Sequence, residues 1–147
     1  MTIEKNIGYS FGDKNLLNRA LIRKAYALEQ KQRDINCEDQ EIFRTLGDAV
    51  LKAALVDILI KSGCKTRDEI TTQKKRLERE EKLSKVGQNL SIGSFIKLGA
   101  GEGKQMANEE PKVLAETLEA LIGAIYLDGG YDASKEVITK WFKSSFA

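Results

Sequence analysis

The sequence predicts an all-α fold in a single domain that covers residues 1–147, built around two buried central helices. Long stretches rich in Ala, Leu, Glu and Lys carry apolar residues at helical spacing, and no useful length of sequence alternates as a strand would. The chain has 147 residues, 41% of them hydrophobic, which is enough for one packed core. One proline, Pro111, and short glycine-bearing breaks separate the helical stretches.

The first expected helix has an apolar face made by Leu16, Leu17, Ala20 and Leu21, and Asp13 is placed to cap its N-terminus. Four further helices are expected, over residues 39–60, 68–89, 111–127 and 133–146. The pair of glycines at residues 129–130 ends the fourth of these five helices.

The second and fourth helices are the candidates for the centre of the fold. In residues 46–60 (LGDAVLKAALVDILI) and 113–127 (VLAETLEALIGAIYL), apolar residues occur on all sides of the helix. This pattern is typical of a helix buried on most sides. We therefore expect the amphipathic helices to wrap around these two.

The composition excludes several kinds of chemistry. With no histidine, the chain cannot hold a Ser-His-Asp triad, a Cys-His pair or a His-ligated zinc ion. Cys37 and Cys64 are too few for a four-cysteine site, and we interpret them as reduced thiols of a cytoplasmic protein. The first ten residues lack the apolar segment of a secretory signal, and no run of about 18 apolar residues predicts a membrane span. Acid–base chemistry must therefore use carboxylates, Lys, Tyr or a metal-bound water held by oxygen ligands.

Three carboxylates lie inside the two apolar helices. Asp48 lies in the first, and Glu116 and Glu119 share one face of the second at i,i+3 spacing. A buried, unpaired carboxylate costs several kcal/mol, so each group needs a cation, hydrogen bonds or a wet cleft. Glu41 and Arg44 fall in the same stripe as Asp48 at about 100° per residue. If the two stripes face each other, their oxygens suit Mg²⁺. A cluster of salt bridges around Arg44 is the alternative that the spacing leaves open.

Two other segments could meet phosphate groups. Residues 61–79 contain seven Lys and Arg against three Asp and Glu, a local net charge of +4, although such runs are usually solvated helix faces. Gly99, Gly103 and Lys104 are one residue short of a G-x-x-x-x-G-K phosphate-binding loop, and Gln105 replaces its Ser or Thr. We therefore expect a mobile loop there and no nucleotide cofactor.

Several motifs together resemble the ribonuclease III family. EIFRTLGDAVL (residues 41–51) is similar to that family's signature N-E-x-L-E-F-L-G-D-(A/S)-x-L. VLAETLEALIGAIYLDG (residues 113–129) is similar to its second stretch, L-A-D-x-(F/V/L)-E-A-(L/F)-(I/L)-G-A-(I/V)-(Y/F)-L-D. Residues 9–21 and 82–98 match the family's opening pattern and the stretch before its variable loop. The resemblance covers nearly the whole chain, in order.

The resemblance implies a helical, homodimeric endonuclease domain that cuts double-stranded or structured RNA and leaves 5′-phosphate ends. It implies Mg²⁺ as cofactor, which Mn²⁺ can replace, with Asp48, Glu116 and Glu119 as metal ligands. The expected catalytic set is Asp48, Glu119, Glu41 and Arg44. The residues expected to contact RNA are Lys74, Lys75, Arg76, Arg79 and Lys104. The chain ends about where the family's separate RNA-binding domain begins, so we expect a stand-alone nuclease domain and no contact with membranes.

Two residues depart from the family pattern. Arg44 stands where the signature has a glutamate that binds metal. It lies one turn before Asp48, and it is expected to pair with that carboxylate or with Glu41. Thr45 stands where the signature has the phenylalanine that contacts the partner subunit, so Phe43 or its apolar neighbours are expected to take its place. The alternative to an active enzyme is a weakened or silent member of the family that binds RNA as a structural module. An unrelated helical protein whose acids only form salt bridges is the third interpretation.

Overall fold

The computed structural model describes residues 2–146, which form eight α-helices and three short 3₁₀ helices, with no strand. The prediction of an all-α fold is confirmed. The α-helices are α1 (Ile3–Ile7), α2 (Lys14–Ala20), α3 (Lys24–Gln32), α4 (Glu41–Lys61), α5 (Arg67–Glu78), α6 (Glu80–Asn89), α7 (Ala100–Lys104) and α8 (Pro111–Trp141). The 3₁₀ helices are η1 (Gly93–Phe95), η2 (Ala107–Glu109) and η3 (Lys143–Ser145).

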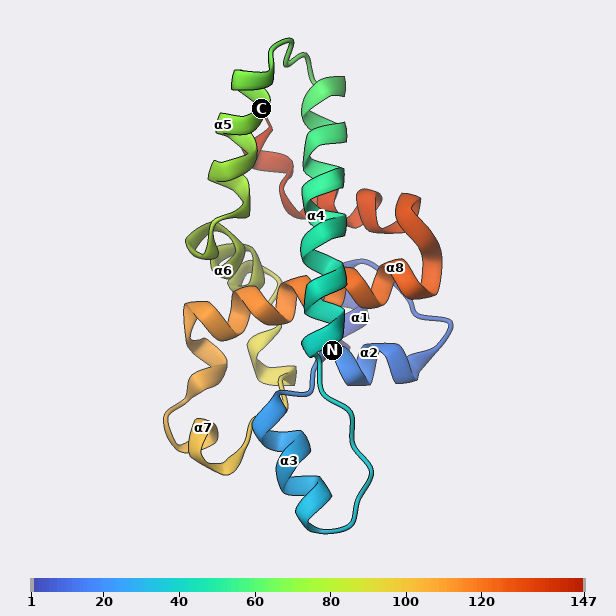
Figure 1. Cartoon of the computed structure of the whole chain (residues 1–147), viewed down its shortest axis with the longest axis vertical. Helices are drawn as coiled ribbons and strands as arrows, with labels where there is room; N and C mark the ends of the chain where they lie inside the picture. The colour runs from blue at the N-terminus through green and yellow to red at the C-terminus, as the bar shows by residue number, and fades with distance from the viewer. Residues whose placement is uncertain (1, 147) are drawn as a thin grey trace.

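Helices α4 and α8 make the largest contact in the fold and form its centre. Figure 1 shows α4 running along the long axis of the molecule while the first half of α8 crosses it. The core between them contains fully buried side chains from both helices, among them Leu51, Leu55, Leu118 and Leu121. The expected pair of central helices is therefore present.

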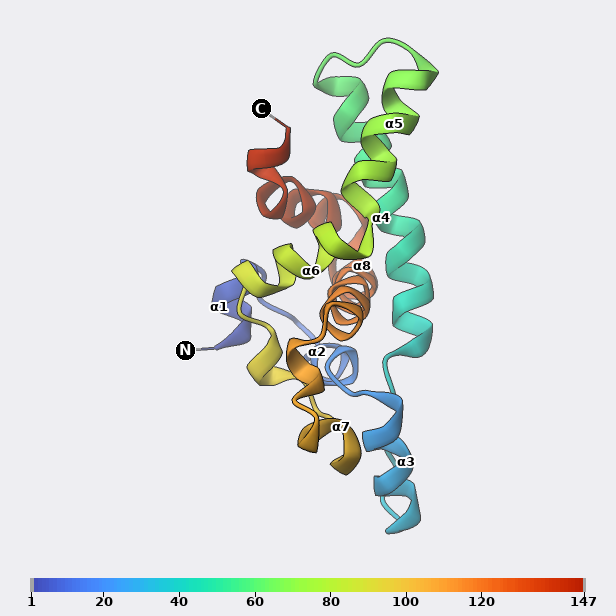
Figure 2. The same ribbon diagram turned by 90° about the vertical axis from the view of Figure 1, so that its left-hand side faces the viewer.

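The expectation that α4 is buried on most sides is wrong for its outer face. Ile42 and Ile60 are 61% and 55% exposed, and Ala49 and Ala53 between them are not buried either. Figure 2 shows α4 at the edge of the molecule, with α8 on its inner side only. An apolar helix face is thus open to solvent in the single chain. By contrast, α8 is buried as expected until Tyr126 and Leu127.

The helix expected over residues 68–89 is two helices, α5 and α6. Arg79 separates them with an extended backbone conformation (φ −65°, ψ 147°). No proline or glycine marks this point in the sequence. The turn lets α5 pack beside α4 while α6 packs on α8, so that Leu77 and Leu83 both reach the core. One straight helix would carry one of these leucines away from it.

The predicted stop at residues 129–130 is confirmed, because non-helical backbone at Gly130 divides α8 into two helical segments of different direction. Gly130 has φ 87° and ψ −177°, a conformation that side-chain-bearing residues rarely adopt, and the two halves of α8 meet at this kink. The second half turns back over the first, as Figure 1 shows. Ser134, Val137 and Ile138 on this half are buried.

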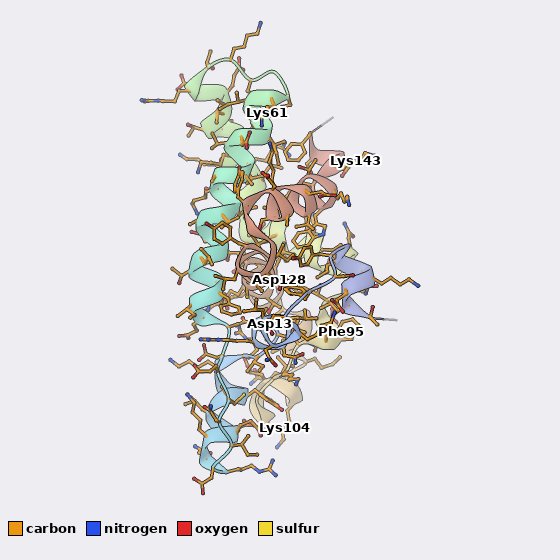
Figure 3. The ribbon with its side chains drawn as sticks, turned by 90° about the vertical axis from the view of Figure 1, so that its right-hand side faces the viewer. Asp13, Lys61, Phe95, Lys104, Asp128 and Lys143 are labelled. Carbon is orange, nitrogen blue, oxygen red and sulfur yellow. The ribbon has the colours of Figure 1, made fainter. Side chains whose placement is uncertain are left out.

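Asp128, just before the kink, ties the N-terminal segment to α8. Its carboxylate accepts hydrogen bonds from the Tyr9 hydroxyl (2.6 Å) and from the backbone N–H groups of Gly12 and Asp13 (both 2.9 Å). Figure 3 shows Asp13 and Asp128 side by side. Asp13 caps α2 as expected, because its side chain accepts a hydrogen bond from the N–H of Asn15.

Helices α1, α3 and α7 were not expected. Each of these helices is short, so few residues define its pattern in the sequence. In α3 only Ala27 is buried, so the helix shows no clear apolar face. Helix α7 forms within the glycine-rich segment that we expected to be a loop, and it lies with α3 at one end of the molecule (Figure 2). No helix among residues 2–146 is both long and apolar enough to cross a membrane.

Candidate functional site

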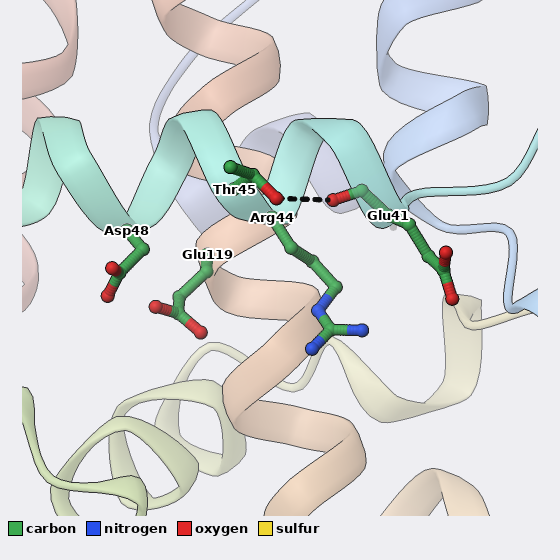
Figure 4. Close-up of a pocket in the computed structure, with 5 residues that line it drawn as sticks. All are labelled: Glu41, Arg44, Thr45, Asp48 and Glu119. Carbon is green, nitrogen blue, oxygen red and sulfur yellow. Dashed lines mark hydrogen bonds between the residues drawn. The ribbon is translucent and has the colours of Figure 1, made fainter.

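A cleft of about 540 Å³ opens where α4 and α8 cross. Glu41, Arg44, Thr45 and Asp48 of α4 line it together with Glu119 of α8. Figure 4 shows the Asp48 and Glu119 carboxyl groups next to each other, the Arg44 guanidinium beyond them, and Glu41 farthest away. The cleft therefore brings together all four residues of the expected catalytic set.

Asp48 and Glu119 form a carboxyl pair, as expected. Burial raises the pKa of Glu119 to about 8, and the hydrogen bond with Asp48 and the charge of Asp48 act in the same direction. Burial also acts to raise the pKa of Asp48, but hydrogen bonds from Lys52 and from Glu119 lower it below its ordinary value. The raised pKa of Glu119 and the lowered pKa of Asp48 mean that Glu119 binds a proton more tightly than Asp48 does.

Lys52 supplies the nearest positive charge to this pair. Its Nζ lies 2.7 Å from the Asp48 carboxylate, one turn away on α4, and 3.9 Å from Glu78 of α5. Glu78 also pairs with Lys74 at 3.2 Å. Asp48 is therefore the first residue of an ion-pair network that continues through Lys52 and Glu78 to Lys74 on α5.

Glu116 does not join the carboxyl pair. Its Oε1 accepts a hydrogen bond from Arg23 at 2.9 Å, and its Oε2 accepts one from Arg44. The expectation that Arg44 pairs with Asp48 or Glu41 on its own helix is wrong, because the long side chain reaches across to α8 instead. Glu41 has Lys24 as its ion-pair partner, at 3.8 Å.

Arg23, which shares Glu116 with the cleft residue Arg44, is a residue that no sequence pattern indicated. It immediately precedes α3, and it donates to the Gln40 side chain (3.2 Å) and lies 3.4 Å from Glu102 of α7 as well as binding Glu116. Gln40 is 1% exposed and in turn donates to the Ala20 carbonyl. A buried arginine needs such partners, but Arg23 lies in a connecting segment without periodic spacing, so its burial could not be read from the sequence.

The carboxyl groups in the cleft fit a cation site with two carboxylate ligands, and not the site with three carboxylates that was expected. Within the described part of the chain, no three His, Cys, Asp or Glu side chains gather as metal ligands would. Asp48 and Glu119 remain, and their carboxyl groups lie next to each other in the cleft (Figure 4). Two carboxylates with open solvent beside them match the ligand number that Mg²⁺ takes from proteins, since water and substrate phosphate complete its shell.

The five residues expected to bind RNA do not share one surface. Lys74 pairs with Glu78 and borders a groove beside α4, whereas Arg76 and Arg79 line a separate hollow together with Lys82 and Lys85. Lys75 is exposed on α5. Lys104 is also exposed, but it lies on α7, at the opposite end of the molecule from Lys61 (Figure 3).

Phe43 cannot take the place of the phenylalanine that Thr45 replaces. Its side chain is 4% exposed, and the Arg19 guanidinium lies 4.8 Å from its ring centre. Thr45, by contrast, is exposed and its hydroxyl lies 3.4 Å from the Glu41 carbonyl. The open face of α4 therefore carries Ile42, Ala49 and Ile60 but no aromatic side chain.

Comparisons with known proteins agree on one family. The family described as "Ribonuclease-III-like" matches residues 13–145. The Ribonuclease 3 proteins of Syntrophobacter fumaroxidans and Desulfotalea psychrophila are 36% and 37% identical to the chain over 141 and 140 residues. Each alignment covers 95% of this chain and 57% of the relative, so the chain spans less than three fifths of the length of these relatives.

Two solved structures of the nuclease domain of ribonuclease III from Campylobacter jejuni share the fold. The first has a TM-score of 0.86 at 28% identity and covers 98% of this chain and 96% of that chain. The second has a TM-score of 0.84 at 28% identity and covers 97% and 92%. The first of these was described for structural flexibility in a region involved in dimer formation.

Proposed function

The chain belongs to the ribonuclease-III-like family, and from this premise we propose that it is an endoribonuclease that hydrolyses double-stranded or structured RNA. The observation that carries the proposal is the Asp48–Glu119 carboxyl pair in an open cleft between the two central helices. A phosphodiester is a poor target for carboxylates alone, and a paired carboxyl site of this kind suits a divalent cation.

Asp48 and Glu119 would hold that cation, Mg²⁺ or the more tightly bound Mn²⁺. When bound, it supplies Lewis-acid stabilisation of charge on the phosphate and makes an attacking water more acidic. Lys52 orients Asp48 through their 2.7 Å ion pair, and burial of Glu119 keeps its carboxyl group in position beside Asp48. The products would carry 5′-phosphate ends, as the resemblance to the family implies.

We further propose that two copies of the chain pair through the open face of α4. Ile42, Ala49, Ala53 and Ile60 lie along it, and a groove of about 670 Å³ lined by Ala53, Val56 and Ile60 continues this face toward α5. A helix that is apolar all round and exposed on one side is typical of an interaction site. A two-fold pair would place two clefts on one assembly, which gives an RNA duplex a longer surface than one small domain offers.

Incubation of the purified protein with long double-stranded RNA tests the proposed activity. We expect shortening of the RNA with Mg²⁺ or Mn²⁺ and none with EDTA, and the ends of the products should be substrates for a 5′-phosphate-dependent exonuclease. The Arg44–Glu116 ion pair favours a second candidate function, a silent module that binds RNA, because it takes a carboxylate away from cation binding. A protein that binds duplex RNA but never cuts it with either metal would support that alternative.

A further inference from the structure

Glu116 is held between two arginines, Arg23 and Arg44, of which Arg44 lines the cleft. The side chains of Glu116 and Arg23 are only 14% and 15% exposed, and that of Arg44 is 31% exposed. Each carboxylate oxygen of Glu116 already accepts a hydrogen bond from a different guanidinium. Breaking such a half-buried arrangement to bind a cation would leave two arginines without their shared partner, which is costly.

The two arginines differ in how much of their hydrogen-bonding capacity is used. Arg23 has Glu116, Gln40 and Glu102 around it. A guanidinium has five N–H donors. Among the described residues, Glu116 is the one side chain that accepts a hydrogen bond from Arg44. The Nε atom of Arg44 is buried without a partner, so its remaining capacity lies at the exposed end of the side chain, which lines the cleft.

Arg44 supplies the cationic group of the cleft. Glu116 is shared between Arg23 and Arg44, and Glu102, at 3.4 Å, pairs with Arg23 and not with Arg44. Among the described residues that line the cleft, Arg44 is the one Lys or Arg, and it lies on the same cleft as the Asp48–Glu119 pair. A planar guanidinium with free N–H groups is the side chain best suited to bind a phosphate through two hydrogen bonds.

We propose that Arg44 binds a phosphate of the RNA backbone in the cleft, and that Glu116 is a positioning residue that acts through Arg44 and does not ligate a cation. This inference rests on the proposed function, since it needs RNA as the ligand of the cleft. It assigns the two ends of the cleft different tasks. Asp48 and Glu119 face the cation, and Arg44, oriented by Glu116, faces the phosphate.

The test uses a short RNA duplex as probe, in EDTA, so that binding is measured without cleavage or metal. Arg44→Met should weaken binding roughly 10-fold and lower the slope of log affinity against log salt concentration by about 1, since one phosphate contact is lost. Arg44→Lys keeps the charge and should recover part of the affinity. Arg33→Met is the matched control, because Arg33 is an exposed arginine at the end of α3 that does not line the cleft, and it should change binding less than about 2-fold.

A double-mutant cycle separates the two roles of Glu116. If Glu116 acts through Arg44, Glu116→Gln should weaken duplex binding several-fold in the wild type and have no further effect in the Arg44→Met background. It should leave the Mn²⁺ concentration for half-maximal binding, measured by calorimetry without RNA, unchanged. A rise of about 10-fold or more in that concentration for Glu116→Gln would mean that Glu116 is a cation ligand and would overturn the assignment.

The outcomes also separate this inference from the proposed function. If the wild type cuts RNA with Mg²⁺ but Arg44→Met binds the duplex as tightly as the wild type, the proposed function stands and the phosphate contact is rejected. If the wild type neither binds nor cuts duplex RNA, both fail. Circular dichroism of each variant verifies that it is folded, and Arg44→Lys, with its milder change, gives the same comparison should Arg44→Met unfold.

Discussion

Gly47 of α4 lies directly against the backbone of α8 at Gly123. A Cβ atom on Gly47 would come within 1.7 Å of the Glu119 carbonyl oxygen and 3.0 Å of the Gly123 nitrogen. A Cβ atom on Gly123 would come within 2.2 Å of the Phe43 carbonyl oxygen. The two helices therefore cross backbone to backbone, and this closeness brings Asp48, the residue after Gly47, beside Glu119.

Gly47→Ala should destabilise the fold by about 3 kcal/mol or prevent folding, because the methyl group meets backbone atoms that cannot move independently. Urea denaturation measures the change. Gly101→Ala is the control, since Gly101 has nothing within 4 Å of its Cβ position and lies in a helix, where alanine is favoured by about 0.5–1 kcal/mol. Equal stability of Gly47→Ala and wild type would contradict the close crossing.

Asp48→Asn should lower RNA cleavage at least about 100-fold with Mg²⁺, because the variant loses a charged oxygen ligand and the partner of the Glu119 proton. The stability should change little, since the side chain is 47% exposed and keeps its size. Gel-based cleavage rates and a thermal melt check the two parts separately. Asp68→Asn, an exposed carboxylate on α5, should cleave like the wild type. Unchanged cleavage by Asp48→Asn would reject the proposed site.

In EDTA, the stability of the fold should fall as the pH rises from about 5 to about 8. The pKa of Glu119 is raised to about 8 from an ordinary value of 4.5, so the folded chain keeps a proton that the unfolded chain releases. The free energy of unfolding therefore decreases steadily as the pH rises between these two pKa values. The shifted acids Glu4, Asp48, Asp57 and Asp128 have lowered pKa values and titrate below this range.

Urea midpoints at the two pH values measure this effect. Glu119→Gln keeps a neutral side chain at both, so its stability should be nearly constant across the range. If Glu119→Gln loses as much stability as the wild type over this range, the loss does not come from Glu119.

Charged substitutions on the open face of α4 should keep the chain monomeric. Ile42→Asp places a charge on the exposed apolar face, where a second copy would have to bury it without a partner. Sedimentation velocity should give twice 16.4 kDa for the wild type and 16.4 kDa for the variant. Leu28→Asp, a similar change at a 49% exposed position on α3, should remain dimeric. A wild type that stays monomeric at micromolar concentration would rule out pairing through α4.

The central helices and the Asp48–Glu119 pair could be predicted from the sequence for a clear physical reason. A carboxylate inside an apolar run is costly unless something nearby compensates it, so Asp48 and Glu119 stand out in the sequence alone. Gly47 and Gly123 are visible in the same runs, but a glycine in a helix does not say which neighbour approaches it. The close crossing can therefore be seen only in three dimensions.

The partner of Arg44 could not be predicted, because spacing rules describe neighbours on one helix. Arg44 and Asp48 satisfy the i,i+4 rule, yet Asp48 has a partner in Lys52, which satisfies the same rule in the other direction. Glu116 on α8 is more buried than Asp48, so its carboxylate needs a partner more, and Arg44 pairs with it across the helix crossing. The break between α5 and α6 at Arg79 was missed for a related reason. It is determined by tertiary packing, and no residue near it in the sequence marks it.

Arg44→Glu should have opposite effects on the binding of cation and RNA. The variant replaces a positive charge beside Glu116 with a negative one, so Glu116 keeps only Arg23 as its partner, and the cleft gains a carboxylate near Glu119. Mn²⁺ should bind more tightly in calorimetry, because the local charge changes by two units and an oxygen ligand is added. Binding of an RNA duplex in EDTA should weaken, because the phosphate meets a carboxylate where it had met a guanidinium.

Cleavage rates of Arg44→Glu then separate two roles for Arg44. If Arg44 only hinders the cation, the variant will cut RNA faster than the wild type at low Mg²⁺. If Arg44 holds the phosphate, the variant will cut more slowly at saturating Mn²⁺ although it binds the metal better. We expect the second combination, because Arg44 lines the cleft with unused N–H donors beside the Asp48–Glu119 pair.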